Sequence, residues 1–77
     1  LTRYFGSVAV DSQRANREMG LIVEEVIQRL TSLTGCDVEI HLEISARRPE
    51  GFDEAIVRTI SENSRTLKFT SHSFEAD

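Results

Sequence analysis

Cysteine is nearly absent from this sequence: 77 residues contain one cysteine, together with one proline, one methionine and no tryptophan. A single cysteine excludes an intrachain disulfide and a multi-cysteine zinc site. We expect Cys36 to be a small buried apolar group, with a reactive thiol as the alternative. The lack of paired cysteines favours a reducing cytoplasm as the location.

Long apolar runs and glycine-rich loops are also missing. No run approaches the 18 or so residues that a membrane span needs, and no secretory signal segment is present, so we expect no membrane partner. The four glycines are isolated from one another, and no Gly-x-x-x-x-Gly-Lys-Ser/Thr segment occurs. This excludes nucleotide binding of the P-loop kind by these residues.

The charge balance is acidic, with 13 Asp and Glu against 9 Lys and Arg, which gives a net charge of −4. A net negative charge disfavours general attraction to phosphate backbones, although a local basic patch remains open. At this length we expect a single small domain over residues 1–77, whose core buries about 60% of the unfolded surface and is therefore marginal. Because the chain begins at Leu1 and its one methionine is Met19, we expect a domain excised from the C-terminus of a larger protein.

A helix is predicted from about Gln13 to Thr34. Asp11 or Ser12 can supply its N-cap oxygen, and Gly35 fits the left-handed position after its last turn. Glu25 and Arg29 are spaced to form a surface ion pair. The apolar stripe recurs with the helical period at Ala15, Met19, Ile22, Val23, Val26, Ile27, Leu30 and Leu33.

Three strands are predicted, over residues 4–10, 37–47 and 66–70. The second is the best defined, because apolar Val38, Ile40, Leu42, Ile44 and Ala46 alternate with polar residues, which is typical of a strand with one wet face. The turn signals of residues 48–51 follow it.

A second helix is predicted over residues 52–64, with Asp53 and Glu54 in its first turn. Its expected inner face contains Phe52, Ala55, Ile56, Thr59, Ile60 and Asn63. The predicted fold class is therefore α/β, with α+β as the alternative: a two-layer β-α-β-α-β domain with two helices on one face of a three-stranded sheet.

No convergent catalytic cluster is evident, and no cofactor is predicted. Glu39, His41 and Glu43 project from one face of the predicted second strand, about 7 Å apart along it. With His72 they could hold a divalent ion, but a solvated sheet face is the preferred interpretation and we assign no metal site.

Two charged groups are candidates for interaction. Arg47 and Arg48 precede the second helix, whose N-terminus together with them could hold a phosphate, although Glu50, Asp53 and Glu54 oppose this. Arg58 and Glu62 lie one turn apart and are expected to pair on the helix surface. Their alternative role is a docking patch.

Several stretches resemble one protein family. They are residues 5–8, the helix core 22–27, and above all Val57-Arg58-Thr59-Ile60-Ser61-Glu62-Asn63 with Thr66-Leu67-Lys68-Phe69; Pro49 and Gly51 add to the pattern. Together they resemble the C-terminal segment of a family of large, largely uncharacterised bacterial P-loop ATPases, over residues 4 to about 75. The resemblance implies that the ATPase motor lies upstream and attaches no catalytic role to these residues.

The leading functional hypothesis is a non-catalytic accessory domain of such an ATPase-like protein, in contact with the rest of the parent or with a second copy as a homodimer. The alternative is a nucleic-acid-binding appendage that uses the Arg47-Arg48 loop or the polar sheet face. A stand-alone enzyme is the third hypothesis, and it is disfavoured because 77 residues without a polar cluster leave little room for a pocket.

Overall fold

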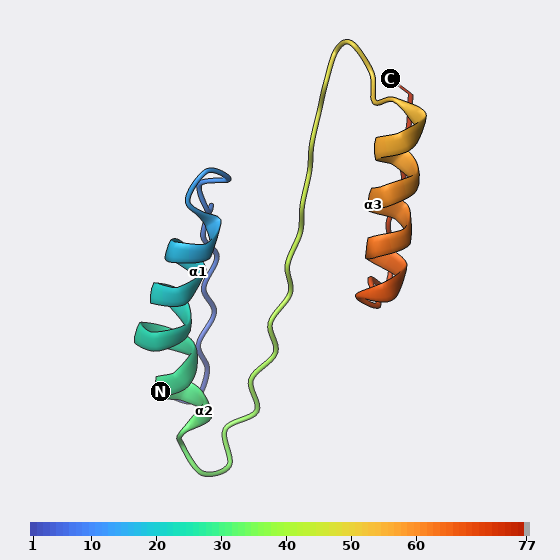
Figure 1. Ribbon diagram of the computed structural model, residues 1–77. Helices are drawn as coiled ribbons and strands as arrows, with labels where there is room; N and C mark the ends of the chain where they lie inside the picture. Colours follow the sequence, from blue (N-terminus) through green and yellow to red (C-terminus); the bar gives the residue numbers. More distant parts are fainter. Residues whose placement is uncertain (77) are drawn as a thin grey trace. The chain divides into compact units, whose positions relative to one another are not determined.

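The structure is a computed structural model that describes residues 1–76 (Figure 1). Its elements are α1 (Ala15–Ile22), the π-helical segment η1 (Val23–Ile27), α2 (Gln28–Thr31) and α3 (Glu54–Thr66). The chain divides into two compact units, residues 1–42 and the unit that begins at Glu43. Each unit is described by itself below.

The predicted α/β fold is wrong for the part of the chain that the structure describes, because residues 1–76 contain helices and no β-strand. Residues 4–10 and 37–47 have neither helical nor strand pairing, and Thr66 is the last residue of α3. A strand exists only when a second backbone segment accepts and donates its hydrogen bonds. The alternating pattern predicts two faces, but it contains no information about such a partner, and apolar Ile40, Leu42 and Ile44 are exposed like their polar neighbours.

The helix of the first unit runs without interruption from Ala15 to Thr31 through α1, η1 and α2, within the predicted range. Its start differs from the prediction. Arg14 is the N-cap residue and makes no side-chain cap, whereas Asp11 Oδ1 accepts a hydrogen bond from the Gln13 amide at 2.9 Å. The Asp11 amide in turn donates to Glu18 Oε1 at 3.1 Å. These two bonds tie the preceding loop to the first helical turns.

The apolar stripe of this helix is confirmed as its sheltered face. Leu33, however, is 58% exposed, because the helix already ends with Ser32 as its C-cap. Gly35 has a φ of 78°, so the predicted left-handed glycine is confirmed, three residues beyond the C-cap. The half-buried apolar residues are Ala15, Met19, Ile22, Val23, Val26, Ile27 and Leu30.

The second unit is organised around α3. Asp53 is its N-cap, and the carboxylate accepts a hydrogen bond from the Ile56 amide at 2.9 Å. Such a cap satisfies one of the amides that have no partner within the helix. Glu54 lies in the first turn, as predicted, where the helix dipole favours a negative charge.

The C-terminal end of α3 is closed by a Schellman motif. The Lys68 amide donates to the Arg65 carbonyl at 3.0 Å, and the Phe69 amide donates to the Ser64 carbonyl at 2.9 Å. This pattern needs a left-handed residue between the two bonds, usually glycine. Lys68 takes that conformation here with a φ of 63°. The chain therefore reverses at Lys68.

The C-terminal tail lies against α3 after this reversal. Phe74 packs edge-on against Phe52, with the ring centroids 5.2 Å apart. The lengths are similar: the helix from Glu54 to Ser64 rises about 15 Å, and an extended chain from Phe69 to Phe74 spans about 17 Å. The tail trace, drawn in dark red, follows α3 in Figure 1.

The tail covers a different face of α3 from the one predicted to be inside. Val57 and Ser61 are half-buried, and Ser64 is buried with 7% of its surface exposed. By contrast, Ile56 is 42% exposed and Ile60 is 44% exposed. Of the predicted inner face, only Phe52 is sheltered; Ala55, Ile56, Thr59, Ile60 and Asn63 are exposed.

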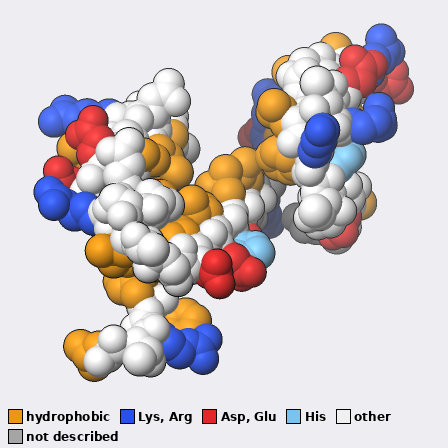
Figure 2. Space-filling model, turned by 90° about the horizontal axis from the view of Figure 1, so that it is seen from below, with side chains coloured by type: hydrophobic (Ala, Val, Ile, Leu, Met, Phe, Trp, Pro, Cys, Tyr) orange, Lys and Arg blue, Asp and Glu red, His pale blue; other side chains and the backbone are white. Residues whose placement is uncertain are grey.

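Apolar burial is scarce throughout. Among residues 1–76 no hydrophobic side chain is fully buried, and orange apolar side chains reach the surface in Figure 2. Cys36, predicted to be buried, is exposed. Each unit is thus held mainly by local hydrogen bonds and by partial cover of one helix face.

Replacing Lys68 by glycine is expected to stabilise the second unit. A left-handed conformation costs a residue with a side chain about 1 kcal/mol, and glycine adopts it without that cost. We therefore expect K68G to raise the free energy of unfolding by up to about 1 kcal/mol, measured by urea titration of the far-ultraviolet circular dichroism signal. K68A removes the same charge without freeing the backbone, so equal stabilisation by both variants would contradict this assignment.

Candidate functional site

The structure brings Glu39 and His41 together but does not build a metal centre around them. His41 Nε2 lies 3.9 Å from Glu39 Oε2, and the two side chains are 85% and 89% exposed, respectively. Such an exposed pair contributes little, and it is an ion pair only when the imidazole is protonated. Within residues 1–76, no group of three or more His, Cys, Asp or Glu side chains is arranged to hold a metal ion. Glu43 and His72 are exposed as well.

The Arg47-Arg48 loop forms the predicted turn. The Gly51 amide donates to the Arg48 carbonyl at 2.9 Å, and Gly51 takes a left-handed φ of 85°. Arg48 Nε lies 3.4 Å from Glu50 Oε2. This ion pair offsets part of the positive charge that a phosphate would need.

The predicted pair of Arg58 and Glu62 is not formed. In the described part of the chain no ion pair joins them within 4 Å, although both side chains are exposed on α3. The other predicted pair is confirmed, with Arg29 Nη2 3.7 Å from Glu25 Oε2. Both pairs are four residues apart, yet an ion pair forms in the first helix only. Exposed ion pairs contribute little, because the attraction between the charges barely exceeds the entropy that the two side chains lose.

An exposed apolar stripe on the side of α3 opposite to Arg58 and Glu62 was missed by the sequence reasoning. Ile56 and Ile60 lie one turn apart on α3 and are 42% and 44% exposed, on a face that the C-terminal tail leaves open. The stripe was assigned to the core because both residues are large and apolar. Arg58 and Glu62 lie on the same helix, so α3 presents both apolar and charged groups to the solvent.

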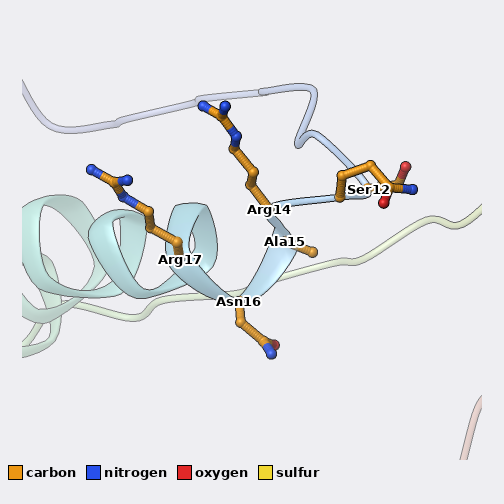
Figure 3. A pocket seen from close by; sticks show the side chains of 6 residues that line it. Ser12, Arg14, Ala15, Asn16 and Arg17 are labelled. Carbon is orange, nitrogen blue, oxygen red and sulfur yellow. The ribbon is translucent and has the colours of Figure 1, made fainter.

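A shallow depression at the start of α1 is lined by Ser12, Gln13, Arg14, Ala15, Asn16 and Arg17. Figure 3 shows Arg14 and Arg17 on one side of this turn and Asn16 on the other. Arginines at a helix start attract anions in general. Here Asp11 and Glu18 lie beside them and are joined by a hydrogen bond, so the local charge is balanced. None of the residues predicted to interact lies in this depression.

Comparison with protein-family models, with curated proteins and with solved structures finds no match to this chain. Among the described helices, none is both long enough and apolar enough to cross a membrane.

The nucleic-acid alternative predicts a defined salt dependence. If Arg47 and Arg48 each neutralise one phosphate, the slope of log affinity against log salt is about −1.8 for a DNA duplex, and R47A/R48A flattens it. The acidic chain and the Arg48–Glu50 pair favour the other outcome, in which no binding is detected. Fluorescence anisotropy with a labelled duplex at two salt concentrations measures this. R14A/R17A is the matched control, and an equal loss from both variants would contradict a role for the loop.

Proposed function

We propose that this chain is a non-catalytic interaction module, in which the exposed apolar side chains dock onto another protein surface. The support is the apolar stripe of Ile56 and Ile60, which α3 presents to the solvent beside the exposed polar residues Thr59 and Asn63. A protein surface with contiguous apolar groups and polar neighbours is characteristic of interaction sites. The assignment to a larger bacterial ATPase-like parent rests on the sequence resemblance over residues 4 to about 75, which is clearest in residues 57–69.

The electrostatic arrangement supports docking over a purely structural role for the charged residues. Arg58 and Glu62 do not form an ion pair with each other. Replacing both by alanine therefore breaks no ion pair between them. Asp53 and Lys68, which close the two ends of α3, are separate residues with their own hydrogen bonds. A change at the docking stripe can therefore leave the hydrogen bonds at both helix ends in place.

Hydrogen exchange tests this proposal, with the full-length protein that contains these residues compared with the 77-residue chain. We expect the amides of residues 54–66 to exchange at least about tenfold more slowly in the full-length protein, because docking adds about 1.4 kcal/mol or more against local opening. I56S/I60S should remove the extra protection. R58A/E62A, on the opposite side of α3, should reduce the protection less than I56S/I60S does, and should leave the stability of the isolated chain within about 0.5 kcal/mol.

The matched control is E24S/E25S, which changes two exposed residues of the first unit and should leave the protection of α3 intact. Equal exchange rates in the full-length protein and the isolated chain would contradict the proposal. A loss of helix in isolated R58A/E62A, seen by circular dichroism, would instead assign the two residues a structural role.

A further inference from the structure

The segment from Asp37 to Arg47 pairs with no strand among the residues that the structure describes. Its apolar residues Ile40, Leu42 and Ile44 are 60%, 68% and 70% exposed. The apolar residues all have even numbers and the polar residues odd numbers, so an extended segment has one apolar and one polar face. Exposed backbone groups next to an apolar face form a template for pairing with another chain.

The sequence of this segment is complementary to itself in one antiparallel register. When two copies are aligned with Leu42 opposite Leu42, Ile40 lies opposite Ile44 and the apolar faces coincide. In the same register His41 lies opposite Glu43, and Asp37 lies opposite Arg47. Directly opposed groups of opposite charge stabilise an antiparallel pair, and a two-fold axis through Leu42 repeats each contact.

The two neighbouring registers that keep the apolar faces together are expected to be less stable, because they place unfavourable side chains opposite each other. Alignment about His41 places Glu39 opposite Glu43, and directly opposed like charges are destabilising. Alignment about Glu43 places Val38 opposite Arg48. A shift by a single residue puts apolar side chains opposite polar ones. The register about Leu42 is therefore the one that charge and hydrophobicity both favour.

The apolar face of the paired segment is continuous in this register. Ile40, Leu42 and Ile44, which are 60%, 68% and 70% exposed in the single chain, lie on the same face of the ribbon in both copies. Apolar side chains that face one another across two strands stabilise the pair.

We propose that two copies of this chain associate through residues 37–47, which pair antiparallel about a two-fold axis at Leu42. The inference goes beyond the proposed function, because it concerns residues 37–47 and not the stripe of α3, and it names a second copy as the occupant of this exposed segment. It assigns no strand to the single chain, because the second copy supplies the backbone partner.

Cysteine cross-linking tests the register directly. In a C36S background, L42C places two thiols on the axis, within the 4.4–6.8 Å between Cα atoms that a disulfide allows. We expect most of the L42C chain to become a covalent dimer under mild oxidation. E39C in the same background is the control, because two copies of residue 39 lie about 20 Å apart in this register. A mixture of E39C and S45C chains should cross-link, and neither should do so alone.

A charge exchange provides a second readout that a folding defect would not imitate. D37R places like charges opposite each other at both ends of the ribbon and should weaken dimerisation about tenfold. D37R/R47D should restore it. Light scattering coupled to size exclusion at several concentrations measures the association of both variants.

The outcomes separate this inference from the proposed function. A monomer at every concentration would overturn the dimer, and slower exchange of α3 in the full-length protein would still support docking onto another surface. A dimer in which E39C cross-links as efficiently as L42C would overturn the register. A dimer with selective L42C cross-linking and charge-exchange rescue supports the inference in full.

Discussion

Cover for apolar side chains is the constraint on which this molecule depends. A chain of this length obtains stability chiefly by removing apolar surface from water, and within the described residues no hydrophobic side chain is fully buried. The local structure that remains is held by bonds between near neighbours: Asp11 to Gln13 and Glu18, Asp53 to Ile56, and the carbonyls at the end of α3. Such bonds define where helices begin and end. They do not by themselves supply a core.

The two units cover their apolar side chains to different extents. In the first, the apolar stripe of the helix is half-buried, but the segment that follows Cys36 keeps its large side chains in water. In the second, the chain turns back at Lys68, Phe74 of the tail packs against Phe52, and Val57, Ser61 and Ser64 form the sheltered face of α3. Most of that covered face is small and polar, so the larger Ile56 and Ile60 remain outside. This distribution of burial is what makes α3 a candidate interaction surface.

Sequence reasoning predicted the features that depend on local signals. The two helices, placed to within three residues at their ends, Glu54 in the first turn of α3, the left-handed Gly35 and the Glu25–Arg29 pair all follow from residues within a few positions of one another. The strands could not be predicted correctly in the same way. The alternation of Val38 to Ala46 indicates two faces, but whether a second backbone lies beside it is decided by segments elsewhere or by another molecule.

The error at α3 has a similar origin. Size and hydrophobicity favoured Ile56 and Ile60 for the inside, whereas the observed face is set by the direction in which the tail leaves the helix. That direction depends on a left-handed lysine, and lysine carries no signal for such a conformation. The predicted interaction residues were placed correctly as exposed groups. Their pairing was not, because the geometry of exposed charges is decided by small energies.

The π-helical segment η1 has a consequence for how the chain tolerates changes in length. Each backbone amide in Val23–Ile27 reaches one residue further back than in an α-helix, so this segment accommodates one residue more than a regular turn. Deleting a residue there would convert the segment into ordinary α-helix and preserve the continuous backbone bonding from α1 to α2. The same deletion elsewhere would rotate later side chains by about 100° relative to earlier ones. The helix of the first unit therefore contains a built-in position at which an insertion or deletion can be absorbed.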